Sequence, residues 1–203
     1  MPADPHAPRK RPTQARAQAT WDAILDATAQ VLVSDGLDKA STNRVAKVAG
    51  VSIGSLYQYF PNKHALVAAV VDRYAEEEGL LLAQSMVELA HEPVRVLVPA
   101  FVARMLDAHE RNPPLLRAIL QQAMHLGIER LRDIDDRSNA LLSDWIRARS
   151  AELDVPDPDA TAPGLATAVL ATAHARVLGS IQLDRPTLER ELTQMILRML
   201  GAR

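Results

Sequence analysis

The side chains best suited to specific chemistry in this chain are uncharged hydrogen-bonding groups, and they gather in the segment 52–59. Gln58 can pair with adenine through both atoms of its amide, Ser55 can bond to most base edges, and Ile53 can pack on a thymine methyl. Gly54 costs about 1 kcal/mol of helix propensity relative to alanine, a loss that is explained if the backbone must approach a partner closely. These residue types indicate contact with DNA bases rather than catalysis.

Two short helices joined by a tight turn are needed to position these side chains. Ala46 and Ala49 are small where two helices must cross closely, and Gly50 can end the first helix in the left-handed conformation without steric cost. Ser52 can offer its hydroxyl to the free N–H groups of the second helix, which begins at Ile53. The pattern predicts a helix-turn-helix whose second helix enters the major groove of DNA.

Four further side chains around this motif could contact DNA. Thr42 is predicted to cap the first of the two helices and to hold a phosphate at the helix N-terminus, or to cap it without touching DNA. Arg44 could reach guanine or phosphate, or neither. Tyr57 and Tyr59 could donate hydroxyl hydrogen bonds to phosphates; the alternative is packing with a solvated hydroxyl, which fits Tyr59 better than Tyr57.

The same segment resembles the tetracycline-repressor (TetR) family of bacterial regulators. The residues that carry the resemblance are Thr42, Val45-Ala46, Ala49-Gly50-Val51-Ser52, Gly54-Ser55-Leu56-Tyr57, Tyr59-Phe60 and Lys63. The match covers roughly residues 17–75, and the remainder is similar to the family in length and helical character. The resemblance implies phosphate contacts from Tyr57, Tyr59 and Lys63 and a base contact from Asn43. The residues expected to bind DNA are therefore Thr42, Asn43, Arg44, Ser52, Ile53, Gly54, Ser55, Tyr57, Gln58, Tyr59 and Lys63.

The chain departs from the family pattern at the start of the second helix. Many members have a basic or larger polar residue where this chain has Ile53 and Gly54. Base specificity is therefore expected to depend on Gln58, Asn43 and Arg44.

The charge of the chain is divided unevenly between its two ends. The whole chain carries a net charge of −2, but residues 1–64 hold eight Lys or Arg against five Asp, which leaves 15 basic and 20 acidic residues in the remainder. Because phosphate contacts need cations, only the N-terminal end can supply them. The segment 1–12, with Arg9, Lys10 and Arg11, is expected to be a disordered basic arm that could reach the minor groove, or else a solvated tail.

Other classes of protein find little support in the sequence. The chain has no cysteine, no apolar run long enough to span a membrane and no apolar stretch after its basic N-terminus, so a cytoplasmic protein is expected. Tyr59 and Lys63 form a Tyr-x-x-x-Lys pair, but no glycine-rich dinucleotide loop accompanies it. The six histidines show no i, i+4 pair. We therefore expect no enzyme activity, no cofactor and no metal.

Apolar spacing and the Pro and Gly stops between apolar runs predict an all-α chain of about nine helices. The expected ranges are 13–35, 42–49, 53–59, 62–89, 93–111, from the prolines at 113–114 to 125, 127–153, 162–181 and from 186 onward. We expect a DNA-binding domain over 13–62 and a ligand-binding and dimerisation domain over 63–203.

The last two helices are predicted to form a four-helix bundle with the same pair of a second chain. Residues 162–181 are rich in Ala, Gly, Ser and Thr, which lets helices approach closely, and the final helix carries an apolar stripe. The expected interface residues are Leu165, Val169, Thr172, Val177, Leu188, Leu192, Met195 and Met199. The alternative is that these helices are buried within one subunit. A twofold dimer would suit two DNA half-sites about 34 Å apart.

The resemblance also implies that the helices beyond about residue 75 enclose a pocket for a small molecule that controls DNA binding. The candidate lining residues are Met86, Phe101, Met105, Met124, Trp145 and His174, each of which could instead be plain core. His174 could be a satisfied core or interface histidine or a hydrogen-bond donor to the ligand. The sequence thus indicates a dimeric, ligand-responsive DNA-binding regulator, with repression as the expected mode. The alternatives are an architectural DNA binder without sequence preference and a helical enzyme.

Overall fold

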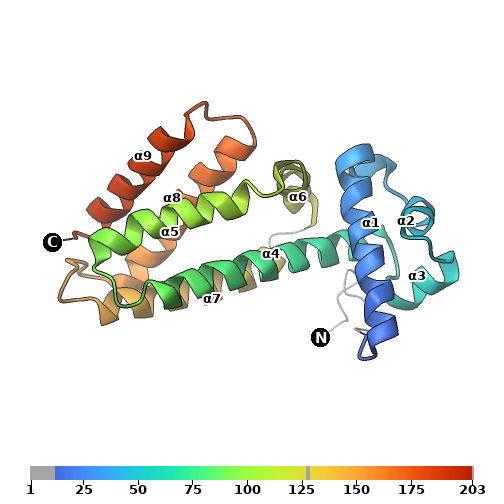
Figure 1. The fold of residues 1–203 in the computed structure, drawn as a ribbon, viewed down its shortest axis with the longest axis horizontal. Coiled ribbons are helices and arrows are strands. Elements are labelled where there is room, and N and C mark those ends of the chain that lie inside the picture. The colour runs from blue at the N-terminus through green and yellow to red at the C-terminus, as the bar shows by residue number, and fades with distance from the viewer. Residues whose placement is uncertain (1–11, 127–128, 203) are drawn as a thin grey trace. The chain divides into compact units, whose positions relative to one another are not determined.

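A computed structural model describes the backbone of residues 12–126 and 129–202, and the side chains of residues 12–121 and 138–202. This part of the chain forms nine helices and contains no strand (Figure 1), which confirms the all-α prediction. The helices are α1 (Ala15–Lys39), α2 (Thr42–Ala49), α3 (Ile53–Tyr59), α4 (Lys63–Glu88), α5 (Val94–His109), α6 (Pro113–Leu126), α7 (Glu129–Ala148), α8 (Pro158–Val177) and α9 (Arg185–Met199).

Most helix boundaries lie within two residues of those expected, and the larger differences are at the end of α1, the end of α7 and both ends of α8, which ends at Val177 and not at residue 181. Gly36 has a φ of 73° and interrupts α1 where its end was predicted, but one further turn runs on to Lys39. The helix α7 ends at Ala148, earlier than expected. The helix α8 begins four residues early because the Asp157 side chain accepts a hydrogen bond from the backbone N–H of Ala160 and Pro158 occupies the first helical position.

The chain divides into two compact units, and the boundary between them falls inside α4. The first unit contains the described residues up to Glu77 together with Pro114–Leu126, and the second contains the rest. The predicted domain boundary, between residues 62 and 63, lies at the start of α4. The two units of the structure divide further along this helix, between Glu77 and Glu78.

Aromatic packing forms the centre of the first unit. Trp21 of α1 is 8% exposed, and its ring centroid lies 4.4 Å from that of Phe60 and 5.9 Å from that of Tyr59. Phe60 and Leu56 are fully buried. Trp21 is therefore a core residue, and it fixes the position of α3 through the residue that ends this helix.

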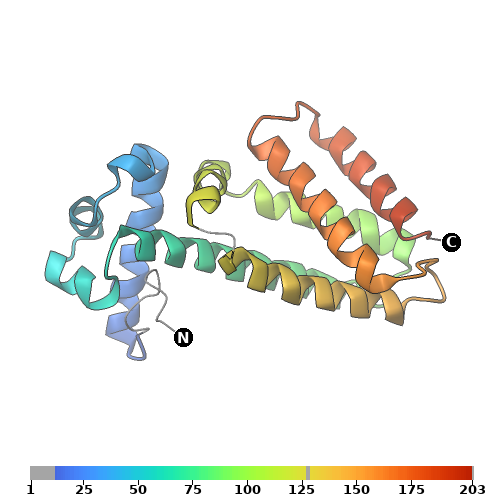
Figure 2. The ribbon, with the colours of Figure 1, turned by 180° about the vertical axis from the view of Figure 1, so that it is seen from behind.

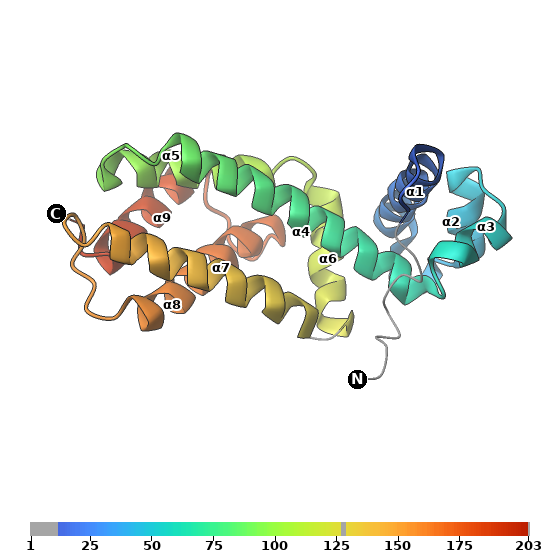
Figure 3. The ribbon, with the colours of Figure 1, turned by 90° about the horizontal axis from the view of Figure 1, so that it is seen from below.

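The second unit has an apolar core built mainly by residues of α5, α8 and α9, with Ile146 of α7. Figures 2 and 3 show these helices from two sides. Leu188, Leu192, Ile196 and Leu200 follow one another at intervals of four along α9 and its C-cap, and all four are buried. This periodicity places one apolar face of α9 against α5 and α8.

Most of the residues expected at the dimer interface are buried inside the second unit of a single chain. The five residues buried within the subunit itself are Leu165, Val169, Val177, Leu188 and Leu192. Because their apolar surface is already covered, they are core residues, as in the alternative of burial within one subunit. Of the remaining three, Thr172 and Met195 are half-buried and Met199 is 40% exposed.

Candidate nucleic-acid interface

The turn between α2 and α3 has the geometry that the sequence predicts. Gly50 adopts the left-handed conformation, with φ 68° and ψ 27°, and the backbone N–H of Val51 returns to the Ala46 carbonyl at 3.0 Å. Ser52 accepts a hydrogen bond from the backbone N–H of Ser55 at 3.0 Å, which caps α3. The two helices are thus held by local hydrogen bonds at a fixed turn.

The cap of α2 is Ser41 and not Thr42. The Ser41 hydroxyl accepts a hydrogen bond from the backbone N–H of Arg44 at 3.2 Å. Thr42 is the first helical residue, and its hydroxyl lies 3.1 Å from the hydroxyl of Tyr57. The prediction of Thr42 as the cap is therefore wrong by one residue, and the contact of Thr42 with Tyr57 depends on how α2 and α3 cross.

The inner face of α3 is buried, and its outer face is exposed. Leu56 is fully buried, whereas Ile53 and Tyr57 are 38% and 41% exposed. Gly54 and Gln58 are also exposed. Of the uncharged side chains predicted to read bases, Ile53 and Gln58 therefore lie on the solvent side of α3, while Ser55 is half-buried and its hydroxyl lies 2.8 Å from that of Ser52.

Gly54 is not required by packing within the chain. A Cβ built at this position would have as its nearest neighbour the Ser52 hydroxyl oxygen at 3.8 Å, an ordinary contact. Gly54 lies in the first turn of α3 and does not have a positive φ. Glycine lowers helix stability relative to alanine, yet Gly54 stands at a position where alanine would fit.

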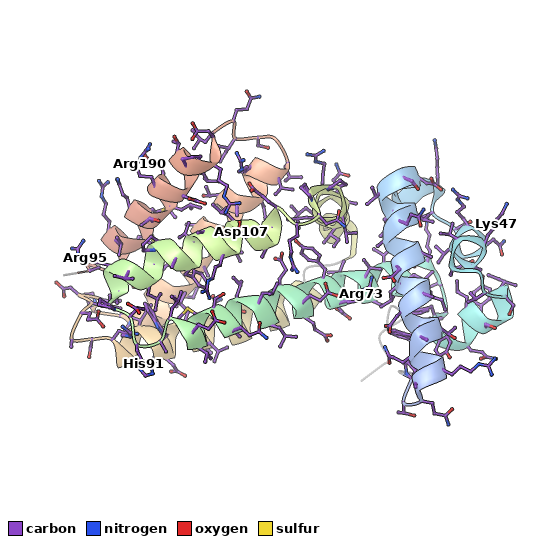
Figure 4. All side chains as sticks on the ribbon, in the orientation of Figure 1. Lys47, Arg73, His91, Arg95, Asp107 and Arg190 are labelled. Atoms are coloured by element: carbon purple, nitrogen blue, oxygen red, sulfur yellow. The ribbon has the colours of Figure 1, made fainter. Side chains whose placement is uncertain are left out.

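Two of the predicted DNA-binding cations are engaged with the end of α1. The Arg44 guanidinium forms an ion pair with Asp35 at 3.0 Å, and the Lys63 ammonium lies 3.5 Å from the Leu37 carbonyl oxygen. A hydrogen bond from Ser34 and a second from Arg44 lower the pKa of Asp35 below its ordinary value. By contrast, Asn43 and Lys47 are exposed on α2, and Figure 4 shows Lys47 extending away from the helix.

The predicted residues of the small-molecule pocket all belong to the second unit, apart from Met124, whose side chain lies outside the described residues. Met105 is buried in the core, while Met86, Phe101 and Trp145 are half-buried and pack against it. His174 is half-buried. An open pocket of about 180 Å³ in this unit is lined by none of these residues but by Ile146, Arg147, Ser150, Leu153, Val155 and Pro158.

Metal-binding groups and membrane-spanning helices are absent from the described part of the chain. It contains no group of three or more His, Asp or Glu side chains arranged to hold a metal ion. None of its helices combines the length and the apolar character needed to cross a membrane.

Two family models match the chain. Residues 24–70 match the model described as bacterial regulatory proteins, tetR family, and residues 93–200 match the tetracyclin repressor-like C-terminal domain. The second match alone covers more than half of the chain.

Individual relatives agree with these matches. The chain is 38% identical over 80 residues to the A-factor receptor protein of Streptomyces griseus, which covers 37% of this chain and 29% of that protein. It is 29% identical over 98 residues to the nucleoid occlusion factor SlmA of Glaesserella parasuis, covering 48% and 47%. The chain thus spans about half or less of the length of these relatives.

The fold also matches that of a solved regulator. The fatty acid degradation regulator FadR from Bacillus halodurans superimposes with a TM-score of 0.71 at 18% identity, over 95% of this chain and all of that one. At this identity the likeness concerns the fold. Together with the family matches and the geometry of α2 and α3, it shows that the chain belongs to the TetR family of transcriptional regulators and carries that family's helix-turn-helix DNA-binding domain.

Proposed function

We propose that the chain is a dimeric repressor that binds a pseudo-palindromic operator and is released from it by a small-molecule effector. The observation that carries the proposal is the division of α3 into a fully buried face, with Leu56, and an exposed face of Ile53, Gly54 and Gln58. A rigidly backed helix with small and amide side chains outside can enter the major groove and read base edges.

The pair of Thr42 and Tyr57 would hold the DNA backbone beside this helix. Their hydroxyls lie 3.1 Å apart, at the N-terminus of α2 and on the exposed side of α3. Two hydroxyls at one helix N-terminus can donate to the same phosphate, and the helix dipole favours its negative charge. Arg44 is held by Asp35 through its Nε, so a DNA contact would come from its remaining guanidinium N–H groups, whereas the exposed Asn43 and Lys47 have no such ion pair to an acidic residue.

The dimer would form through the outer surfaces of α8 and α9. Leu178 at the C-cap of α8, Leu183 in the following loop and Met199 of α9 are exposed apolar residues. The half-buried Thr172 and Met195 lie on the same two helices. Apolar side chains left exposed on adjacent helices support a contact with a second copy.

The effector would act through α4, because this helix belongs to both units. Its residues up to Glu77 are part of the first unit, and those from Glu78 onward are part of the second. In the first unit, Arg73 of α4 forms an ion pair with Asp26 of α1 at 2.8 Å. A ligand that shifts the second half of α4 would therefore act on the helix-turn-helix, and DNA and effector would each oppose binding of the other.

The experiment that tests this proposal is retention of genomic DNA fragments by the purified chain at about 0.15 M salt, followed by release with a compound library. The proposal expects a few retained promoter fragments, a footprint with twofold symmetry, and release by particular compounds. Retention of all fragments alike would instead support the architectural binder. Sedimentation equilibrium decides between monomer and dimer in the same preparation.

A further inference from the structure

Two histidines pack against each other in the interior of the second unit. His109 of α5 and His174 of α8 have ring centroids 5.3 Å apart with an angle of 37° between the ring planes. His109 is 2% exposed and His174 is half-buried. His109 follows Val98, Val102 and Met105 along one buried face of α5, so a polar ring stands where the helix pattern calls for an apolar side chain.

The hydrogen bonds of His109 define which of its nitrogens is a donor. Nδ1 lies 2.9 Å from the Met105 carbonyl oxygen, and because a carbonyl only accepts, Nδ1 carries the hydrogen. In the neutral ring Nε2 is then an acceptor, and it has no hydrogen-bond partner among the described residues. An acceptor buried without a partner is disfavoured, and such groups in native proteins need an explanation.

His174, which is half-buried, also forms no hydrogen bond to a described residue. Its ring packs against the ring of His109, and no described residue accepts from or donates to its nitrogens. Burial, and then the proximity of His109, lower the pKa of His174 to about 4, so the ring is neutral at pH 7 and offers one donor and one acceptor. The pair together presents two acceptors and one donor to a partner that the described chain does not supply.

The charges around the pair restrict the partner. The Glu78 carboxylate of α4 lies 3.7 Å from Nδ1 of His109, so an anion would meet a like charge. Two arginines on these helices are engaged by carboxylates, since Arg176 pairs with Glu110 and Arg104 pairs with Glu88. A group that donates hydrogen bonds, such as a hydroxyl or an amine, satisfies the acceptors without opposing Glu78.

We propose that His109 and His174 form the polar end of the effector site and bind the hydroxyl or amine of an otherwise apolar molecule. This inference rests on the proposed function and adds the chemical class of the effector. The apolar part would lie against the core that Met86, Phe101 and Met105 help to build, where unbranched methionine side chains can adjust to make room.

The test uses three probes with the same eight-carbon chain, namely 1-octanol, octylamine and octanoate, added to the full-length protein without DNA. Histidine ring resonances are followed by NMR, and dissociation constants are measured by calorimetry. We expect octanol and octylamine to shift the resonances of His109 and His174 and to bind at least about tenfold more tightly than octanoate, the contrast expected from one good hydrogen bond. Binding of octanoate as tight as that of the other two, or unchanged ring resonances with all three probes, overturns the proposal.

Variants separate a direct contact from a structural role. His109→Phe should abolish the preference between head groups, whereas His109→Gln, whose amide can still accept a hydrogen bond, should keep part of it. His91→Phe is the matched control, because His91 is exposed in the loop between α4 and α5 (labelled in Figure 4). The NMR titration of the unmodified protein remains decisive if a variant does not fold. Operator binding is measured separately, without any probe. If the protein does not bind an operator, that result counts against the proposed function and not against the histidine site.

Discussion

Gly54 is a glycine inside a helix at a position where the rest of the chain leaves room for a side chain. The exchange Gly54→Ala should stabilise the protein by about 0.5–1 kcal/mol, because alanine favours the helix and a Cβ there meets no close atom. The same exchange should weaken operator binding by about tenfold or more if the backbone of α3 approaches a base closely. Urea unfolding and electrophoretic mobility shift measure the two effects.

Gly79 provides the matched control for this exchange. It lies in α4, and a Cβ built there also meets nothing within 4 Å. Gly79→Ala should give a similar gain in stability with operator affinity unchanged. Weaker operator binding by both variants would show that the effect of Gly54 does not arise at the DNA surface.

Gln58 and Tyr57 should differ in how they affect sequence preference. Gln58→Ala should relax the preference at one base position by about 1–3 kcal/mol, because it removes a bidentate contact to a base edge. Tyr57→Phe removes the hydroxyl that lies beside Thr42 and should weaken binding to all sequences alike. Affinities for an operator series with single base changes separate the two, and an equal loss on every duplex from Gln58→Ala would remove Gln58 from the base-reading residues.

His174 should make the folded state sensitive to acid. Burial and His109 lower its pKa from 6.5 to about 4, so between these values the unfolded chain binds more protons than the folded chain. Its contribution to stability is complete above pH 6.5 and is lost as the pH falls toward 4. Between pH 7.5 and pH 5 the unmodified protein should lose about 1–2 kcal/mol more than His174→Leu in urea unfolding. Equal losses in both proteins would mean that His174 is not held neutral by the fold.

At the scale of single residues, the sequence predicts the roles of residues whose contacts are with residues a few positions away in the chain. Gly50 and Ser52 have the roles expected of them because turn and cap hydrogen bonds join residues a few positions apart. The pair of Thr42 with Tyr57 and the pair of His109 with His174 could not be predicted, because they require the helices to be placed first.

At the scale of elements, one arginine joins the beginning of α9 to α5. Arg185 donates to Glu110 at 2.7 Å and to Asp107 at 2.6 Å, both on or at the end of α5, and to Glu189 at 2.7 Å on α9 itself. Burial raises the pKa of Glu110, but the hydrogen bonds from Arg176 and Arg185 outweigh it and hold the pKa below its ordinary value. The group therefore fixes α8, α9 and α5 at one end of the second unit.

Arg185→Met should destabilise the protein by about 1–2 kcal/mol, because it removes charged hydrogen bonds from the partly buried Glu110 and Glu189. Arg190→Met is the control, since Arg190 is exposed and pairs with its neighbour Glu191 on the surface, and it should change stability by less than about 0.5 kcal/mol. Figure 4 labels Asp107 and Arg190. Chemical denaturation compares the two, and equal effects would contradict a specific role for Arg185.

Apolar periodicity predicts the order of the helices, but it does not predict which surface covers the apolar face of each helix. The apolar stripes of α8 and α9 were correctly expected to need a partner, yet sequence periodicity cannot tell a partner in the same subunit from one in a second subunit. In the structure α5 supplies that partner for α9, which is why Leu188 and Leu192 are core residues.

At the scale of the whole molecule, charge is divided between residues 1–64, which contain the helix-turn-helix, and residues 65–203. The N-terminal residues carry the excess of cations that phosphate contacts require, while the remainder is acidic. The position of the division inside α4 was not evident from the sequence, because an amphipathic helix shows no boundary where it passes from one unit to the other.

The most direct test of the account is competition between the operator and an unrelated duplex of equal length for the purified chain, at about 0.15 M salt. The account predicts a preference of at least about 10³-fold for the operator, with a footprint of two half-sites about 34 Å apart. Equal affinity for both duplexes, or protection of a single half-site, would contradict sequence-specific binding by a paired α3.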